Sequence, residues 1–229
     1  MALHTRWIGL IAALLVAMIS HQSTAWAGCR DKPNAGVDWS GCDKERLILR
    51  GRDLKGANLE RADLSESDLS DIDLQDALMQ ETMLARARIW DADLRGAQLV
   101  KTLGSRADFS RANLEGANLT KSEMSRAVLE DTNLRGANLT KAELSRAHFA
   151  RADLTGASFK FANIARADFT GATLDGVDFS GAYTYLMRVE GVDLSTTQGL
   201  TDEQLHIACG DENTSLPEGL ETPSEWPCQ

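Results

Sequence analysis

The sequence predicts an all-β solenoid, a parallel β-helix in which four short extended segments make one coil. A large apolar residue stands at every fifth position from Leu49 to Leu194, with only Gly104 and Thr184 as exceptions. The residue two places before each of them is usually Ala, Ser or Thr. Residue types also recur at intervals of 20, as in Gly96, Gly116, Gly136, Gly156 and Gly176. A five-residue period with a 20-residue superperiod indicates a solenoid.

The geometry of an extended chain explains how the two periods fit together. Side chains alternate between the two sides of a strand, so the apolar residue and the small residue two places earlier both point inward. The chain must then turn a corner before the next inward pair, and glycine recurs at the first position of the unit, as a tight corner favours. Four such corners close one coil, which accounts for the superperiod. The thirty units of residues 46–195 therefore predict about 7.5 coils and a length of roughly 36 Å.

Four segments follow from these patterns. Residues 1–27 are predicted as a signal peptide, 28–45 as an N-terminal cap, 46–195 as the solenoid and 196–229 as a C-terminal cap. Caps are expected because a single coil cannot fold alone and the stack needs covered ends. A short helix is predicted over residues 201–208, with Thr201 as its N-cap.

Residues 1–27 have the organisation of a secretory signal. Arg6 precedes the 13-residue apolar run Trp7–Ile19, and Ala25-Trp26-Ala27 forms a cleavage site of the A-x-A type. The run is too short for a transmembrane helix, and no other stretch of the sequence is suited to crossing a membrane. We therefore expect export to the periplasm or the exterior. A lipoprotein signal with acylated Cys29 is the alternative, and Trp26 fits it poorly.

All four cysteines lie outside the repeats: Cys29 and Cys42 before them, and Cys209 and Cys228 after them. Export makes disulfides the expected state. The two ends of a rod are far apart, so only Cys29–Cys42 and Cys209–Cys228 can pair. Each bridge is expected to stabilise the fold by about 3 kcal/mol. A metal site is disfavoured because no C-x-x-C pair or histidine partner accompanies the cysteines.

Units such as Arg111-Ala-Asn-Leu-Glu115 and Gly116-Ala-Asn-Leu-Thr120 resemble those of the pentapeptide-repeat family. The resemblance covers about 150 residues and implies a right-handed quadrilateral β-helix. Arg52, Met187, the unit 101–105 with Gly104, and the segment 183–185 depart from the family pattern. These departures predict frayed end coils and one local bulge.

The net charge of −10 is concentrated near the C-terminus. Residues 196–229 contain seven acidic and no basic residues, whereas residues 46–195 contain 23 acidic and 20 basic residues. Some members of the family resemble duplex DNA and act on topoisomerases. B-DNA of the same length carries roughly 21 negative charges, so a net charge of −3 disfavours DNA mimicry, as does export.

Two surfaces are candidates for contact with a partner. Bases recur at 20-residue intervals and predict a positive edge for a polyanion; these are Arg86, Arg106, Arg126, Arg146, Arg166, Lys101, Lys121 and Lys141. Nearby Glu123, Glu143, Asp108 and Asp168 offer the alternative of local neutralisation. Other columns, such as Asp91–Arg111–Asp131–Arg151 and Arg95–Glu115–Arg135, predict ion pairs between coils.

The second candidate surface lies within residues 62–103. Residues 62–85 contain seven acidic and no basic residues. Outward positions there or close by hold Leu78, Met83, Trp90, Val100 and Leu103, and such an apolar patch is typical of a partner site. The alternative is a local irregularity near Gly104 that turns some of these side chains inward.

No set of residues in the sequence suggests catalysis, a cofactor or a small-molecule substrate. After residue 27 the only histidines are His148 and His206, and neither accompanies a nucleophile or metal-ligand motif. We therefore expect a non-enzymatic binding or structural module with a protein or cell-envelope partner. Polyanion binding through the basic edge is the alternative, nucleic acid is disfavoured, and the sequence leaves the oligomeric state open.

Overall fold

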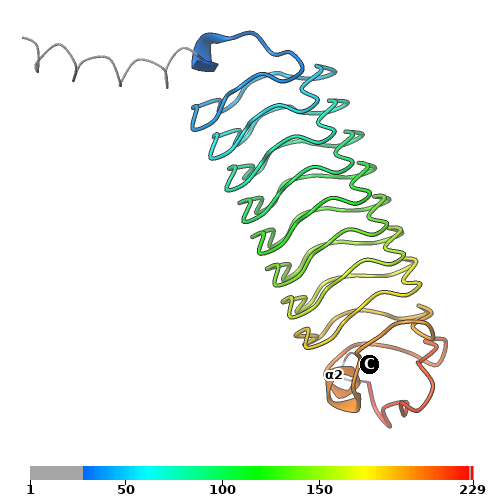
Figure 1. Cartoon of the computed structure of the whole chain (residues 1–229). Coiled ribbons are helices and arrows are strands. Elements are labelled where there is room, and N and C mark those ends of the chain that lie inside the picture. The colour runs from blue at the N-terminus through cyan, green and yellow to red at the C-terminus, as the bar shows by residue number, and fades with distance from the viewer. Residues whose placement is uncertain (1–27, 227, 229) are drawn as a thin grey trace, which may run out of the picture.

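The computed structural model describes residues 28–226 and 228 as a rod of stacked coils (Figure 1). The predicted signal peptide, residues 1–27, lies outside the described residues. Parallel bridges join residues 20 apart at every fifth position, as in the series Leu78, Gln98, Asn118 and Asn138. Four pairing positions therefore occur in each 20-residue coil, as the two sequence periods predict.

The backbone of one unit shows how the coils are held together. Gly116 and Leu119 donate their N–H groups to carbonyls of the following coil, at 2.9 and 2.8 Å, and Asn118 donates to a carbonyl of the preceding coil at 3.0 Å. Ala117 closes the corner by donating to the inward apolar residue of the unit before it. The N–H of Thr120 is accepted by the side chain of Asn118 at 3.2 Å. The outward Asp or Asn of the unit thus supplies an acceptor that the ladder lacks.

The corner residue of each unit has a left-handed backbone. Gly116 has φ of 64° with no atom near the place of a Cβ, which agrees with the predicted role of glycine. Twenty corners instead hold a non-glycine residue at positive φ, among them Arg106, Arg126 and Lys121. The left-handed region disfavours side chains, so these corners are tolerated because the ladders on either side fix them.

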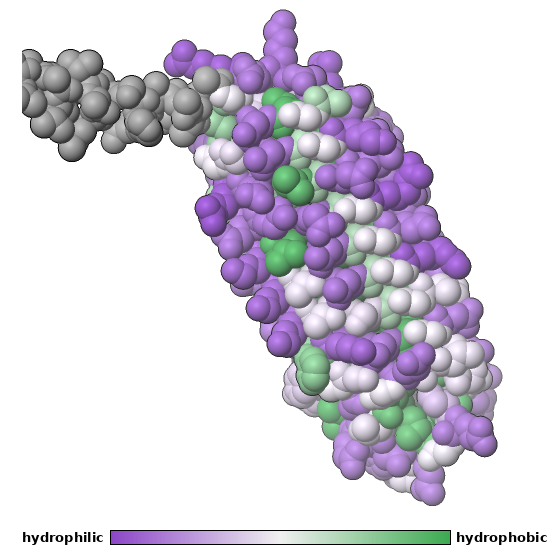
Figure 2. Space-filling model, in the orientation of Figure 1, coloured by the Kyte–Doolittle hydropathy of each residue, from purple (hydrophilic) through white to green (hydrophobic). Residues whose placement is uncertain are grey.

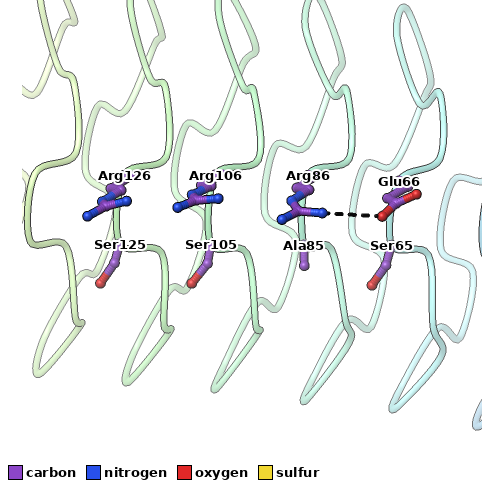
Figure 3. Close-up of a pocket in the computed structure, with 8 residues that line it drawn as sticks. All are labelled: Ser65, Glu66, Ala85, Arg86, Ser105, Arg106, Ser125 and Arg126. Atoms are coloured by element: carbon purple, nitrogen blue, oxygen red, sulfur yellow. Dashed lines mark ion pairs between the residues drawn. The ribbon is translucent and has the colours of Figure 1, made fainter.

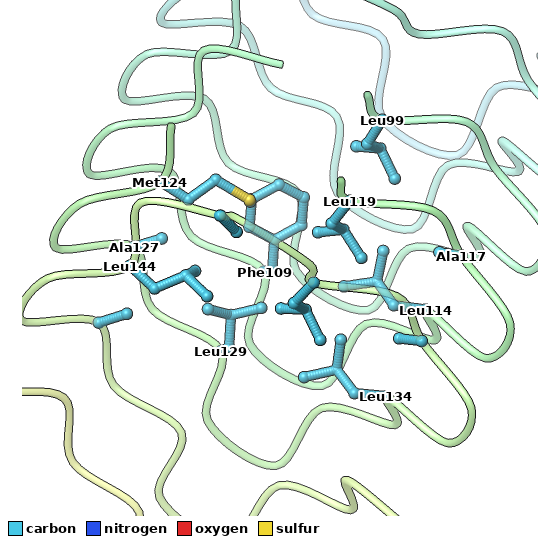
Figure 4. Packing of buried hydrophobic residues seen from close by; sticks show 14 of the residues in the cluster. Leu99, Phe109, Leu114, Ala117, Leu119, Met124, Ala127, Leu129, Leu134 and Leu144 are labelled. Carbon is cyan, nitrogen blue, oxygen red and sulfur yellow. The ribbon is translucent and has the colours of Figure 1, made fainter. Parts of the chain in front are cut away.

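The interior is filled by columns of one large and one small side chain (Figure 4). Leu99 and Leu119 are fully buried in one column, and Ala117 lies in the narrower column beside it. Aromatic rings stack in the same way between coils, with the rings of Phe149 and Phe169 4.9 Å apart and nearly parallel. The inward assignment of both positions is confirmed.

The predicted bulge at Gly104 is wrong. The ladder keeps its 20-residue register through Met83, Leu103 and Glu123. A Cβ at Gly104 would lie 3.3 Å from Cγ of Met124 in the next coil. The long, flexible Met124 side chain packs beside Gly104 and fills the space that a large side chain would occupy there. The backbone therefore keeps the regular coil.

The N-terminal end differs in one respect from the predicted segments. The first bridge pairs Asp38 with Asn58, so coil geometry begins inside the segment predicted as a cap. Before it, the 3₁₀ helix η1 covers Gly28–Arg30. The predicted Cys29–Cys42 disulfide is present, with a Cα–Cα distance of 5.5 Å, and Cys42 occupies a buried inward position.

The C-terminal end carries the predicted helix. Helix α2 spans Asp202–His206, and Thr201 and Gln204 form a capping box at its start. Nε2 of Gln204 donates to the carbonyls of Phe179 and Ala182, so the helix covers open acceptors of the last coil. The Cys209–Cys228 disulfide is also present, with a Cα–Cα distance of 5.3 Å.

Truncation of a core residue tests the packing. Leu119→Ala is expected to lower the free energy of unfolding by about 2–5 kcal/mol, because neighbouring coils cannot collapse into the cavity. Ala117→Leu is expected to cost roughly 1–3 kcal/mol, because the small column has no spare room. Denaturant unfolding measures both values. Midpoints equal to that of the unmodified protein for either variant would contradict the inward placement.

A second substitution separates backbone strain from packing. Gly116→Ala is expected to cost about 1 kcal/mol, because alanine disfavours positive φ although space for its Cβ is available. Arg126→Ala at an equivalent corner is the control and is expected to stay within about 0.5 kcal/mol, since arginine and alanine bear the same strain there. Equal effects of the two substitutions on the unfolding midpoint would refute this account of the corners.

Candidate functional site

One side of the rod gathers most of the basic residues named above. The units that begin at Lys101, Lys121 and Lys141 stack on one another, and each is followed by an arginine at the next corner. We call this side the lysine–arginine face. The four arginines Arg106, Arg126, Arg146 and Arg166 form its second edge, and we call them the arginine strip. All four have positive φ, so each side chain leaves the coil at an equivalent corner.

The arginine strip has no carboxylate partner. Within the described part of the chain, none of its four guanidinium groups forms an ion pair or donates a hydrogen bond to the protein. The carboxylates proposed to neutralise it are engaged elsewhere in three of four cases: Asp168 lies 3.8 Å from Arg188, Asp108 accepts from Ser110, and Glu143 accepts from Nδ2 of Asn163 at 2.9 Å. Neutralisation by ion pairing is therefore absent from this edge. Guanidinium groups without partners keep five N–H donors each for an external anion.

The strip has a defined N-terminal limit. Arg86 lies 3.6 Å from Glu66 (Figure 3). Arg46 contacts the same carboxylate at 2.9 Å. The hydrogen bond from Arg46, together with the charges of Arg46 and Arg86, holds the pKa of Glu66 below its usual value. Arg86 is thus partly neutralised, and the unpaired series starts at Arg106.

Aromatic side chains mark the other end of the strip. Arg166 lies over the ring of Tyr185 at 5.8 Å, and that ring stacks on Tyr183 at 6.3 Å. Tyr183 is 53% exposed and Phe161, at the corner one coil earlier, is 63% exposed. The segment 183–185, which the sequence marked only as a departure from the repeat, therefore places an open aromatic platform beside the strip.

The strip borders a shallow groove of about 430 Å³. Ser65 and Glu66 line its first coil, and the next three coils each contribute an arginine and the residue before it, in the rows Arg86–Arg106–Arg126 and Ala85–Ser105–Ser125 of Figure 3. Sequence reasoning missed the serine row, although Ser105, Ser125 and Ser145 recur once per coil. Small hydroxylated side chains leave the guanidinium groups accessible from the side.

A second groove of about 540 Å³ lies toward the lysine edge of the same face. Met83 and Leu103 form its apolar floor, and Lys101, Lys121 and Glu123 rim it. Lys101 pairs with Glu81 at 3.1 Å, whereas Lys121 and Lys141 form no ion pair with any described residue. The hydrogen bond from Arg61, followed by that from Lys101, lowers the pKa of Glu81.

The acidic stretch 62–85 is partly neutralised by bases in adjacent coils, which pair with four of its seven acids. Glu66 pairs with Arg46, Asp71 with Arg50 and Asp68 with Arg88, at 2.9, 2.8 and 3.2 Å. These pairs are exposed and add little stability. They do, however, remove the continuous negative surface that the sequence taken alone indicates.

The outward apolar residues near this stretch are only partly open. Leu78 and Leu103 are each 39% exposed, and Met83 and Trp90 are half-buried. The guanidinium groups of Arg50 and Arg111 lie 5.5 and 5.4 Å from the Trp90 ring. The register does not turn these side chains inward. Figure 2 shows a face that is mostly hydrophilic, with separate rather than continuous hydrophobic groups.

Of the two predicted ion-pair columns, the one that contains Arg111 and Arg151 is confirmed and the other is wrong. Arg111 pairs with Asp91 and Arg151 with Asp131, at 2.7 and 2.8 Å. The Arg95–Glu115–Arg135 column is wrong. Arg95 instead contacts Asp93 of its own unit at 2.6 Å, and Arg135 contacts Asp153 of the following coil at 2.9 Å.

The described residues contain no group of three or more His, Cys, Asp or Glu that could hold a metal ion. His148 is exposed at an outward position, and Nδ1 of His206 contacts the carbonyl of Asp202 within α2. Over residues 28–226, no helix has the length and apolar character needed to cross a bilayer.

Comparisons with known families agree with the architecture. A family profile described as a pentapeptide repeat region matches residues 105–179. A profile described as pentapeptide repeats (8 copies) matches residues 49–80, 68–99 and 84–120. The two profiles together span residues 49–179, more than half of the chain. No curated protein matches the sequence.

Solved structures similar to the chain are pentapeptide-repeat proteins or share their fold. Full-length QnrB1, a plasmid-mediated fluoroquinolone resistance protein, is 16% identical with a TM-score of 0.54, over 79% of this chain and 91% of its own. HetL of the cyanobacterium Nostoc sp., involved in heterocyst differentiation regulation, is 26% identical with a TM-score of 0.39, over 94% and 97%. The similarity to QnrB1 concerns the fold alone.

Proposed function

Because the chain belongs to the pentapeptide-repeat family, we propose that it is a non-enzymatic binding module that holds an anionic cell-envelope component, or an anionic protein, on its lysine–arginine face. One observation carries the proposal: four arginines in consecutive coils have no carboxylate partner. Elsewhere on the rod, arginines such as Arg111 and Arg151 are paired with the neighbouring coil. Unpaired charge at one edge destabilises an isolated protein through repulsion, which an anionic ligand would relieve.

The same geometry favours a polyanionic ligand over a protein partner that binds through apolar side chains. The partly buried Leu78, Met83 and Trp90 offer only separate apolar contacts. Lys121, Lys141 and the arginine strip together present a stronger recognition element. DNA mimicry is not supported, because bases pair with four of the seven acids in the stretch 62–85 and the repeats contain nearly as many basic as acidic residues.

We further propose that the protein is exported and acts in the periplasm or outside the cell. The signal-peptide pattern of residues 1–27 supports this location, as do the two cystine bridges. Within this proposal the coils wind in the right-handed sense of the family, over about 7.5 coils.

Removal of three strip arginines tests binding. The triple variant Arg106→Ser, Arg126→Ser, Arg146→Ser is expected to lose retention on a heparin column above about 0.1 M salt, where weak surface attraction is screened. The control replaces Arg111, Arg135 and Arg151 by serine, which removes the same charge from paired positions and is expected to preserve retention. Equal elution of both triple variants and the unmodified protein would refute the proposal.

Export has its own test. Expression of the full-length gene in a bacterial host is expected to give periplasmic or secreted protein that starts after residue 27 and contains no free thiol. Deletion of residues 2–27 is expected to leave the protein in the cytoplasm with reduced cysteines. Mass spectrometry after thiol alkylation measures both features. A full-length cytoplasmic product from the intact gene would contradict export.

A further inference from the structure

A row of unused backbone donors runs beside the arginine strip. The N–H groups of Ala85, Ser105, Ser125 and Ser145 donate no hydrogen bond within the described structure. They belong to the fifth residue of four consecutive units on the lysine–arginine face, and we call them the N–H row. On the other sides of the described rod, open donors of this kind occur only singly or in pairs. Ser105 is exposed and Ala85, Ser125 and Ser145 are half-buried, so an external acceptor can reach all four donors of the row.

The side chain two residues earlier explains the row. In most units an outward Asp or Asn accepts this N–H. On this face the outward positions hold Met83, Leu103, Glu123 and Glu143, which are apolar or have one methylene too many to close the short turn. Aspartate or asparagine returns in the flanking coils, where Asp63 accepts from Ser65 at 2.9 Å and Asn163 from Ala165 at 3.2 Å. The N–H row thus begins where the outward Asp or Asn is replaced by another residue, and it ends where Asn163 restores this acceptor.

Three kinds of donor occur together in three successive coils of this edge, those that contain Ser105, Ser125 and Ser145. Ser105 and Ser125 contribute a backbone N–H and a hydroxyl, and the next residue in the chain, Arg106 or Arg126, contributes an unpaired guanidinium. These residues line the groove in Figure 3 as two parallel rows. Oγ of Ser125 lies 3.0 Å from Oγ of Ser145, so the hydroxyl row continues into the next coil. Backbone N–H groups next to a left-handed corner, reinforced by arginine, form an anion-binding arrangement.

We infer that this edge binds a linear polysaccharide that carries one carboxylate per sugar, a polyuronate, with its axis along the rod. This inference rests on the proposed function and specifies the ligand. The complete donor set occurs in three successive coils, about 4.8 Å apart, and an extended 1,4-linked uronate chain advances by a similar distance per sugar. The planar guanidinium matches a carboxylate with two parallel hydrogen bonds.

The other features of the face agree with a sugar polymer rather than a nucleic acid. A single strand requires aromatic side chains on which successive bases stack, whereas the row beside Arg106, Arg126 and Arg146 consists of serine. On the described part of this face, aromatic rings occur only toward the C-terminal end, where exposed Tyr183 and Phe161 can pack against the C–H face of a terminal sugar. Glu123 and Glu143 repel anions and confine the polymer to the arginine edge.

A charge-neutral substitution tests the N–H row. The double variant Glu123→Asp, Glu143→Asp restores the short acceptor to the N–H groups of Ser125 and Ser145. Affinity for polygalacturonate, measured by calorimetry, is expected to fall about tenfold, because a hydrogen bond to a charged group is worth roughly that factor. The thermal midpoint is expected to stay equal or rise. The control Glu60→Asp, Glu115→Asp shortens two carboxylates outside the face and is expected to leave affinity unchanged. Unchanged affinity in the Glu123/Glu143 variant would overturn the role of the row.

Two further probes separate this inference from the proposed function. Heparin binding that depends on Arg106, Arg126 and Arg146, without binding of polygalacturonate, would overturn the polyuronate and leave the binding module intact. Equal or tighter binding of a 20-nucleotide oligothymidylate would also overturn it in favour of nucleic acid. If the unmodified protein binds none of the three probes (heparin, polygalacturonate and oligothymidylate), both proposals are overturned. Polygalacturonate binding that is lost in the arginine triple variant and weakened in the Glu123/Glu143 variant supports both.

Discussion

The structure depends on one constraint: nearly every backbone N–H of a five-residue unit must find an acceptor while the chain turns a corner in every unit. Coils above and below accept three of the five, the corner turn accepts a fourth, and an outward Asp or Asn accepts the last. Unpaired backbone groups cost about as much as a lost hydrogen bond. The strictness of the repeat, including the absence of proline from it, follows from this requirement.

The same constraint turns a substitution on the outside of the rod into a binding feature. An outward Asn118 closes its own unit, and the surface there is inert. An outward Glu123 or Leu103 leaves a donor open at the fifth residue without disturbing the ladder, because the ladder bonds of the other residues are independent of that side chain. The architecture can therefore change its surface chemistry one position at a time while the core remains unchanged. The lysine–arginine face differs from the other sides in this way over four coils.

Ion pairing between surface side chains also depends on the 20-residue register of the coils. Columns with one member per coil bring side chains of successive coils together, and opposite charges in a column pair, as Arg111 does with Asp91. Arg106, Arg126, Arg146 and Arg166 follow one another in a column whose one acid, Glu66, already pairs with Arg46 and Arg86. The sequence alone shows carboxylates two residues from these arginines, but those carboxylates are outward on a different side of the corner and are engaged by other partners, such as Ser110 for Asp108.

The sequence by itself determined the period, the inward positions, both disulfides and the terminal helix, because each depends on local spacing that a 20-residue coil converts directly into contact. It was wrong about Gly104, where the long side chain of Met124 in the next coil compensates inside the core. It also mis-assigned the partner of Arg95, since the direction of a side chain beyond Cβ is not fixed by register. The open backbone donors follow from the residue type two places earlier, but only the structure showed that this side chain is their acceptor. Which arginines stay unpaired was decided only by the tertiary structure, because it depends on distances across coils and around corners that no linear pattern contains.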